Sequence, residues 1–170
     1  HLQSIDTVAA EIGAVNVVSH GCGYNTDWIG FKQSVMPHLR DTDQRALVLG
    51  TGGVSKAVQY ALRDMGIDYT LVSRHAQGDV LGYDMLSAEV MAAHTLIINC
   101  TPLGMLPDVD TLPDIPYTVL TDRHMLYDCV YNPAITAFLR AGQQHEARTI
   151  NGLDMLYAQA DIAWEIWNNK

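Results

Sequence analysis

Residues 45–57, RALVLGTGGVSKA, decide the fold of this chain. Four apolar residues predict a short buried strand, which a glycine-rich turn connects to a helix with apolar residues every three or four positions. Gly50 permits the tight turn, Gly52 lets the backbone approach a pyrophosphate, and Gly53 with the small Ser55 allows close helix–strand packing. The free N–H groups at the helix start favour phosphate. The pattern predicts a dinucleotide-binding unit; a glycine-rich turn without a ligand is the alternative, because Ser55 stands where a third glycine is usual.

The same alternation of short apolar runs and helical stretches continues along most of the chain. Strands are predicted at residues 14–18, 46–50, 69–73, 95–99, 125–131 and 148–150. Helices are predicted at 27–39, at 54–65, from an N-cap and first-turn proline at Asn132-Pro133 to about Gly142, and at 153–167. Nearly continuous apolar strands between helices indicate a parallel sheet covered on both faces. The predicted fold is a doubly wound, Rossmann-type α/β domain, preceded by a short hairpin at residues 14–27.

Composition excludes several classes of protein. The 170 residues carry 10 basic and 19 acidic side chains, a net charge of −9, which argues against a nucleic-acid partner. No apolar run approaches the ~20 residues of a membrane span, and no signal peptide is recognisable, so we expect no membrane partner and a cytoplasmic protein. Three cysteines without a CxxC pair and seven histidines without an HxxxH pair predict neither disulfides nor a metal.

The second strand of the predicted unit indicates which dinucleotide is bound. An NAD site usually places Asp or Glu about 20 residues after the glycine loop, where it accepts the ribose hydroxyl hydrogen bonds. Here the strand is followed by Ser73-Arg74-His75, with no carboxylate. The Arg74 guanidinium can pair with a 2′-phosphate, so NADP is favoured over NAD. A solvated surface arginine is the alternative.

Six sequence blocks in order make the chain resemble the shikimate dehydrogenase family. They are GAVN (13–16), NTDWIGF (25–31), the glycine loop, NCTPLGM (99–105), DCVYNP (128–133) and NGLDMLYAQA (151–160). The resemblance implies an enzyme that reduces 3-dehydroshikimate to shikimate with NADPH. It also implies a substrate domain followed by a nucleotide-binding domain.

The resemblance assigns four residues to the substrate, which is a small molecule. Asn16 and Asp27 match residues that hold the substrate hydroxyls, and Asp27 also matches the carboxylate of a catalytic Lys–Asp pair. Tyr131 matches a pocket-lining tyrosine and Gln159 an amide that reaches the substrate. Taken singly, Asp27 could cap the helix it begins, Tyr131 could pack in the core, and Gln159 could face solvent.

The resemblance assigns a larger set to the cofactor, in three groups. The phosphate loop is Gly50, Thr51, Gly52, Gly53 and Val54; the ribose-phosphate clamp is Ser73, Arg74 and His75; the adenine or nicotinamide side is Thr101, Pro102, Leu103, Cys129, Gly152 and Met155. The family clamp has a second arginine where Gly78 stands here, so we expect weaker binding of the ribose phosphate. Cys100 and Cys129 are predicted to be small core hydrophobes rather than nucleophiles.

The beginning of the chain departs from the family pattern. Only twelve residues precede Gly13, where the family has its substrate domain with a Ser-x-Ser grip and the catalytic lysine. Lys32, Lys56 and Lys170 lie outside that lysine's motif, and an ionised Asp27 donates protons poorly. We therefore expect this chain to bind dinucleotide with little or no turnover. The predicted parts are a remnant of the substrate domain (1–26), a nucleotide-binding domain (27–150) and a C-terminal helix that returns toward the substrate domain (151–170).

Three other functions are compatible with the sequence. The alternatives are a quinate-preferring or broader polyol dehydrogenase, a non-catalytic dinucleotide sensor, and, more weakly supported, a relative acting on folate or tRNA-linked substrates. We expect exposed apolar surface around the first strand and around Trp164 and Trp167, which a homodimer could bury.

Overall fold

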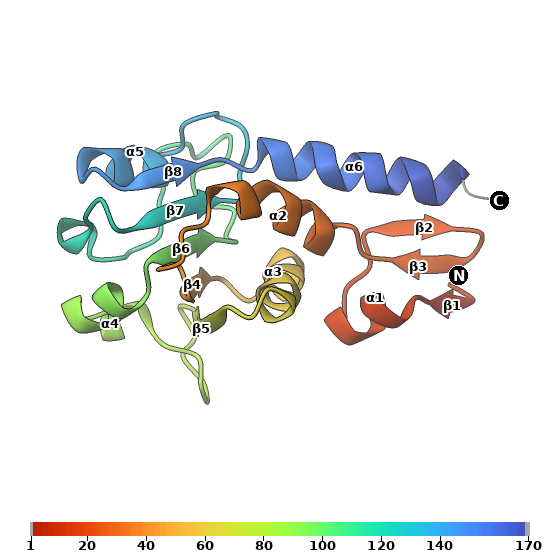
Figure 1. Ribbon diagram of the computed structural model, residues 1–170, viewed down its shortest axis with the longest axis horizontal. Coiled ribbons are helices and arrows are strands. Elements are labelled where there is room, and N and C mark those ends of the chain that lie inside the picture. Colours follow the sequence, from red (N-terminus) through yellow and green to blue (C-terminus); the bar gives the residue numbers. More distant parts are fainter. Residues whose placement is uncertain (1, 169–170) are drawn as a thin grey trace.

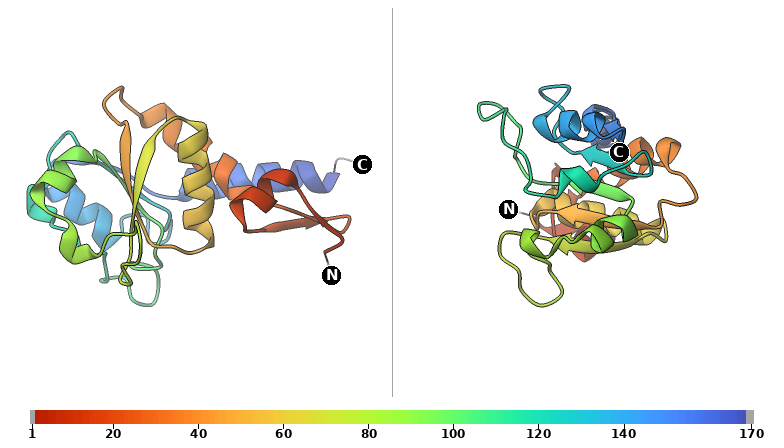
Figure 2. Two further views of the ribbon diagram at one scale, coloured as in Figure 1. Left: turned by 90° about the horizontal axis from the view of Figure 1, so that it is seen from below. Right: turned by 90° about the vertical axis from the view of Figure 1, so that its left-hand side faces the viewer.

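The computed structural model describes residues 2–168 and contains a five-stranded parallel sheet with helices on both faces (Figures 1 and 2). The strand order is β5-β4-β6-β7-β8. The strands are β4 (Arg45–Leu49), β5 (Asp68–Val72), β6 (Leu96–Asn99), β7 (Met125–Asp128) and β8 (Arg148–Ile150). The predicted doubly wound α/β fold is confirmed, and the predicted strands agree with these bounds to within a few residues.

Alternating side chains of the strands fill two separate cores. Ala46 and Val48 face one core, whereas Leu47 and Leu49 face the other. The left view of Figure 2 shows the sheet edge-on with helices on either side. The first core is covered by α2 (Asp27–Val35), α3 (Gly53–Asp64) and α6 (Leu153–Asn168), and the second by α4 (Ala88–Ala93) and α5 (Ala137–Gln144).

The chain reverses its direction of winding at β4, which lies between β5 and β6. Leu49 pairs with both Val72 and Asn99, and Asn99 pairs with Asp128, so these four strands end level with one another. In open α/β sheets, ligands bind beyond the carboxyl ends of the strands where the winding reverses. The loops after β4, β5, β6 and β7 therefore meet where a ligand site is expected.

A second, smaller sheet lies beside the outer half of α6 (Figure 1). It consists of β1 (Ser4–Ile5), β2 (Val17–Ser19) and β3 (Cys22–Tyr24), with α1 (Thr7–Ile12) packed against β3. The far end of α6 is hydrogen-bonded to β2, because the Trp167 indole donates to the Val18 carbonyl at 3.0 Å and the Ser19 hydroxyl donates to the Ile166 carbonyl at 3.3 Å. The predicted hairpin is thus part of a three-stranded sheet.

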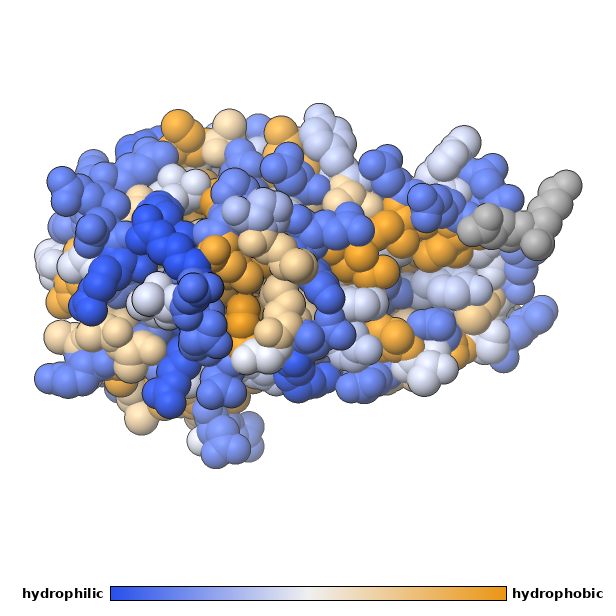
Figure 3. All heavy atoms as spheres, viewed as in Figure 1, coloured by the Kyte–Doolittle hydropathy of each residue, from blue (hydrophilic) through white to orange (hydrophobic). Residues whose placement is uncertain are grey.

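Hydrophobic residues are exposed where α6 lies alongside this small sheet (Figure 3). Trp164 and Trp167 are 66% and 52% exposed, and Val18 on β2 is 51% exposed. This agrees with the apolar surface expected there. Among residues 2–168, no helix is both long enough and apolar enough to cross a bilayer.

One predicted helix begins in the wrong place. Asn132 and Pro133 do not start a helix; α5 begins at Ala137, with Thr136 as its N-cap. The Thr136 oxygen accepts the Leu139 N–H at 3.3 Å, while the Thr136 hydroxyl donates to the buried carboxylate of Asp128. The cap is therefore set by a contact with β7, not by the local Asn-Pro pair. Strand β7 likewise ends at Asp128, three residues earlier than predicted.

Candidate functional site

Three adjoining pockets form one groove along the carboxyl edge of the large sheet. Their volumes are about 900, 340 and 310 Å³. The first and second share residues 100–102, and the second and third share Val54, Cys129 and Tyr131. The groove thus extends from the loops after β4 and β5 to the start of α6.

The first pocket surrounds the glycine loop. A Cβ atom added at Gly52 or Gly53 would have no other atom within 4 Å, so the fold leaves both positions open. Gly50 differs, because its φ of +103° and the Thr101 side chain, 3.1 Å from an added Cβ, both favour glycine. The prediction that Gly53 serves close helix–strand packing is wrong, since nothing packs against it. The loop instead offers an unfilled cradle at the N-terminus of α3.

The predicted clamp lies in the same pocket. Ser73, Arg74 and His75 all line it, and the His75 N–H donates to the Ser73 hydroxyl at 3.2 Å. Arg74 is exposed and has no carboxylate within 4.0 Å in the part of the chain that the structure describes. Burial raises the pKa of the Tyr83 hydroxyl and the Arg74 guanidinium opposes that shift, which places this charge beside the pocket wall.

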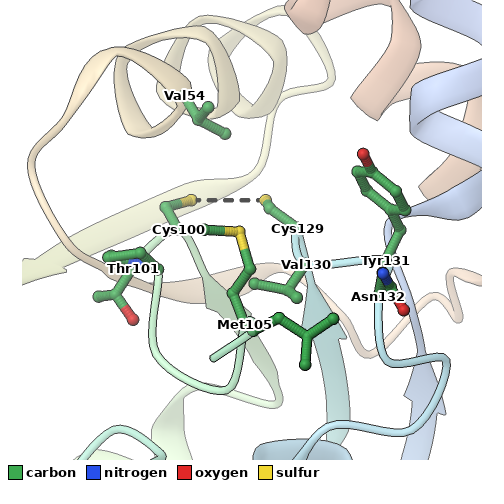
Figure 4. A pocket seen from close by; sticks show the side chains of 10 residues that line it. Val54, Cys100, Thr101, Met105, Cys129, Val130, Tyr131 and Asn132 are labelled. Atoms are coloured by element: carbon green, nitrogen blue, oxygen red, sulfur yellow. Dashed lines mark hydrogen bonds between the residues drawn. The ribbon is translucent and has the colours of Figure 1, made fainter. Parts of the chain in front are cut away.

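The second pocket is lined by two thiols (Figure 4). Cys100 and Cys129 follow β6 and β7, and their Sγ atoms point toward one another at 3.8 Å. Both are half-buried and pack against the first core, as predicted for small hydrophobes, yet both also face the groove. Their proximity was not predicted, because it depends on the pairing of two strands that lie 29 residues apart.

A buried network holds the two loops that form the walls of this pocket. The Asp128 carboxylate, 0% exposed, accepts hydrogen bonds from the Asn99 amide and the Val130 N–H, both at 3.0 Å, and from the Thr136 hydroxyl. The Asn99 oxygen in turn accepts the Thr101 N–H at 3.0 Å. Burial raises the pKa of Asp128 to about 6, although these hydrogen bonds favour the charged form. The carboxylate therefore positions both loops.

The third pocket brings together all four predicted substrate residues. Asn16, Asp27, Tyr131 and Gln159 line it. The Asn16 amide donates to the Asp27 carboxylate at 2.9 Å, and the Thr26 hydroxyl donates to the Gln159 oxygen at 3.2 Å. Gln159 thus points toward α2 and not into solvent, and Tyr131 is 46% exposed instead of packed in the core.

Asp27 does not cap its own helix. The first amides of α2, those of Asp27 and Trp28, donate to the Asn25 side-chain oxygen at 3.1 and 3.4 Å. The Asp27 carboxylate is left facing the pocket, where burial raises its pKa and the hydrogen bond from Asn16 lowers it. The capping alternative is therefore wrong for this residue, and the carboxylate is available to a ligand.

The remaining predicted cofactor residues also line the groove, with one exception. Gly53 lines none of the three pockets and begins α3. The others are Gly50, Thr51, Gly52, Thr101, Pro102 and Leu103 in the first pocket, Val54 and Cys129 in the second, and Gly152 and Met155 in the third.

Sequence reasoning missed several lining residues, because they lie outside the quoted motifs or, like Met105, Val130, Asn132 and Leu156, inside a motif but without an assigned role. They are Ala76, Gly82, Tyr83, Asp84, Leu112 and Asp114 in the first pocket, Met105, Leu106, Val130 and Asn132 in the second, and Leu156 in the third. A signal in composition was present for the Pro- and Asp-containing segment after β6, which supplies Met105, Leu106, Leu112 and Asp114.

Neither described lysine is paired with Asp27. Lys32 forms a salt bridge with Asp64 at 2.6 Å, and the Lys56 ammonium donates to the Gly13 carbonyl at 3.4 Å. Lys170 lies outside the described residues. Within residues 2–168, no three His, Cys, Asp or Glu side chains gather as ligands for a metal ion.

Comparison with known proteins finds relatives among the NADP(+) shikimate dehydrogenases. The chain is 36% identical to the NADP(+) shikimate dehydrogenase of Carboxydothermus hydrogenoformans, over 98% of this chain and 66% of the relative. It is 32% identical to that of Methanococcus maripaludis, over 100% and 67%. The crystal structure of shikimate 5-dehydrogenase from Thermus thermophilus in complex with NADP(H) and shikimate superposes with a TM-score of 0.84 at 30% identity, over 99% and 67%.

The matches extend over nearly all of this chain but not over all of each relative. The chain spans 65–66% of the length of the first three curated relatives. No protein-family model matches it.

Proposed function

The chain belongs to the shikimate dehydrogenase family, and from that premise we propose that its groove holds NADP(H) at one end and a shikimate-like substrate at the other. The whole enzyme would reduce 3-dehydroshikimate to shikimate. The observation that supports this proposal is the continuous groove itself. An open glycine cradle and the Arg74 guanidinium, which has no carboxylate within 4.0 Å among residues 2–168, lie at one end, and a cluster of carboxylate and amide side chains lies at the other.

The residues of the first pocket fit a doubly phosphorylated adenosine. The open position at Gly52 admits a diphosphate, and the N-terminus of α3, which begins at Gly53, favours its charge. Arg74, with Ser73 and His75 beside it, would hold the 2′-phosphate that distinguishes NADP from NAD. The nicotinamide would lie against the walls formed by Val54, Cys129 and Met155, and when bound it supplies the hydride.

The third pocket would bind the hydroxyl groups of the substrate. Carboxylate and amide groups suit a polyol, because together they accept and donate hydrogen bonds, and Asn16, Asp27 and Gln159 provide both. A dinucleotide sensor would have no use for this cluster, so its presence favours an enzyme. Asp27 would orient a substrate hydroxyl in the whole enzyme.

Residues 1–170 alone would bind cofactor without turning over substrate. Reduction of a ketone needs a proton delivered to the developing alkoxide, and Asp27 is accompanied by Asn16 but by neither Lys32 nor Lys56. We also propose residues 27–150 as the NADP-binding domain, residues 151–170 as a C-terminal helix that returns toward the substrate domain, and residues 1–26 as a remnant of that domain's edge with the interdomain connection.

Calorimetric titration of this chain with NADP+ and with NAD+ tests the cofactor assignment. NADP+ is expected to bind more tightly, and Arg74→Ala should reduce its affinity about tenfold or more, because a charge-assisted pair contributes roughly 1.5–3 kcal/mol. Arg140→Ala, which removes an exposed arginine on α5, is the matched control and should leave both affinities unchanged. Equal affinity for the two dinucleotides would overturn the assignment of NADP.

An absorbance assay of NADPH formation from shikimate and NADP+ tests the claim about turnover. We expect no detectable rate from residues 1–170 at saturating cofactor. A measurable rate would show that this chain contains a complete proton-transfer site. Substituting quinate for shikimate in the same assay, with the whole enzyme, separates the two substrate preferences.

A further inference from the structure

Cys100 and Cys129 occupy neighbouring positions directly after two paired strands. Asn99 and Asp128 are register partners, and the pairing continues through the Cys129 N–H, which donates to the Asn99 carbonyl at 3.0 Å. Neighbouring strands lie about 4.8 Å apart. That spacing falls within the roughly 4.4–6.8 Å between Cα atoms that a disulfide spans.

The two thiols point to the same side of the sheet and face one another. Their Sγ atoms are 3.8 Å apart, and Figure 4 shows both thiols directed toward each other beneath Val54. Since both side chains are on one face, rotation about their Cα–Cβ bonds can bring the sulfur atoms into bonding distance without reversing either strand. The geometry is that of a dithiol that can close.

Small oxidants can reach this pair. Both cysteines are half-buried and line the second pocket, which is continuous with the larger first pocket. Cys22 differs, because it lies on β3 in the small sheet and its thiol is directed to the carbonyl of Gly23. Cys22 therefore serves as an internal control, because among residues 2–168 neither of the other two cysteine thiols lies beside it.

We propose that Cys100 and Cys129 form a redox-active dithiol that closes to a disulfide when the groove is empty and that bound dinucleotide shields from oxidation. The closure depends only on the position of the two thiols. The shielding rests on the proposed function, because it requires NADP(H) to lie against Cys129. The oxidant is a peroxide.

The reaction proceeds in two steps that balance. In the first, the Cys100 thiolate attacks a peroxide oxygen; an S–O bond forms, the O–O bond breaks, and hydroxide leaves a sulfenic acid on Cys100. In the second, the Cys129 sulfur attacks the Cys100 sulfur; the S–S bond forms, the S–O bond breaks, and water leaves with the Cys129 proton. The proton that Cys100 lost on forming its thiolate converts the hydroxide to water, so two thiols and one hydrogen peroxide become one disulfide and two waters.

The environment of the two thiols suits this order of events. The hydrogen bond to Cys100 and burial both raise the pKa of the Cys129 thiol, which favours the protonated thiol that enters the second step. Cys129 then serves as the resolving thiol.

Peptide mapping of the oxidised protein tests the closure. The full chain carrying Cys22→Ser is treated with hydrogen peroxide, its remaining thiols are alkylated, and its digest is analysed by mass spectrometry. We expect one cross-linked peptide joining Cys100 to Cys129, the simultaneous loss of both free thiols, and recovery of both with dithiothreitol. Wild-type protein, which needs no substitution to fold, should give the same cross-link and keep Cys22 alkylated.

The matched control removes one partner. Cys100→Ser in the same background should leave Cys129 as a free thiol or a single adduct, with no cross-link. Independent oxidation of the two thiols in the Cys22→Ser protein, without a cross-linked peptide, would overturn the dithiol.

Repeating the oxidation at saturating NADP+ tests the shielding. We expect the cross-link to form at least tenfold more slowly, whereas the alkylation rate of Cys22 in wild-type protein stays the same. If calorimetry shows that NADP+ binds and the cross-linking rate is unchanged, the shielding is wrong. If NADP+ does not bind but the cross-link forms, the proposed function fails and the dithiol stands.

Discussion

Two glycine positions at the same edge of the sheet differ in what surrounds them. At Gly52, in the loop after β4, an added Cβ would meet no atom within 4 Å. At Gly152, where α6 begins, an added Cβ would lie 2.4 Å from the carbonyl oxygen of Cys129. The fold therefore requires glycine at the second position and not at the first. The space at Gly52 is left for something outside the protein, which is the physical basis for assigning the cradle to a ligand.

The largest effect on stability should come from adding a side chain at Gly152, where the backbone leaves no space for one. Gly152→Ala is expected to lower the free energy of unfolding by about 3 kcal/mol, because the methyl group would displace the end of β7 from the start of α6. Urea denaturation followed by circular dichroism measures the loss. Gly52→Ala is the matched control. Equal stability of the two variants would contradict the conclusion that the fold requires glycine at residue 152 and not at residue 52.

The buried carboxylate of Asp128 should make stability depend on pH. The folded protein holds the Asp128 proton more tightly than the unfolded chain, because its pKa rises from 3.8 to about 6. The free energy of unfolding should therefore fall as pH rises through this interval, by about 3 kcal/mol relative to Asp128→Asn. Denaturation curves of both proteins between pH 4 and pH 7, in steps of about half a unit, measure the difference.

A difference in stability between wild type and Asp128→Asn that stays constant over this range would mean that the Asp128 carboxyl group is ionised in the folded protein as easily as in the unfolded chain.

Substitution at the open position should affect binding and spare the fold. Gly52→Ala is expected to change the free energy of unfolding by only about 0.5 kcal/mol, the difference between glycine and alanine at a helix N-cap. Its methyl group would occupy the cradle, so the affinity for NADP+ should fall roughly 10- to 100-fold by calorimetry, equivalent to the loss of one or two charge-assisted hydrogen bonds. Unchanged affinity would place the phosphates elsewhere.

The smallest effect is expected from substitution of Gly53, and it concerns stability. Gly53→Ala should raise the free energy of unfolding by about 0.5 kcal/mol, because alanine restricts the unfolded chain and favours the first turn of α3. Thermal unfolding by calorimetry measures the gain. A loss of stability would show that the first turn of α3 has no space for a methyl group.

Much of the large sheet could be predicted from the sequence, because its central strands β4, β6 and β7 are buried and carry a local apolar signal. In β4, four apolar residues follow Arg45, and the glycine turn marks the end of the strand. The small sheet was predicted only as a hairpin, since β1 has just two residues and its pairing with β3 is a tertiary contact. The six-residue helices α1 and α4 are too short to show a helical period.

The site was predictable residue by residue but not as an arrangement. The motifs located Asp27 and Gln159, whereas the hydrogen bond that orients Gln159 comes from Thr26, a residue of the NTDWIGF block to which the sequence assigned no role. The approach of Cys100 and Cys129 and the capping role of Thr136 depend on which strands pair and where they end. Local sequence does not determine either property.

The longest helix connects the two parts of the molecule. Its sixteen residues span about 24 Å. One end is fixed where Gly152 fits against the backbone of Cys129, the middle carries Gln159, and the far end is bonded to β2 through Trp167. Because α6 is held at both ends, a displacement of the small sheet along the axis of α6 would also move Gln159 in the third pocket. The two sheets therefore cannot shift independently without breaking one of these contacts.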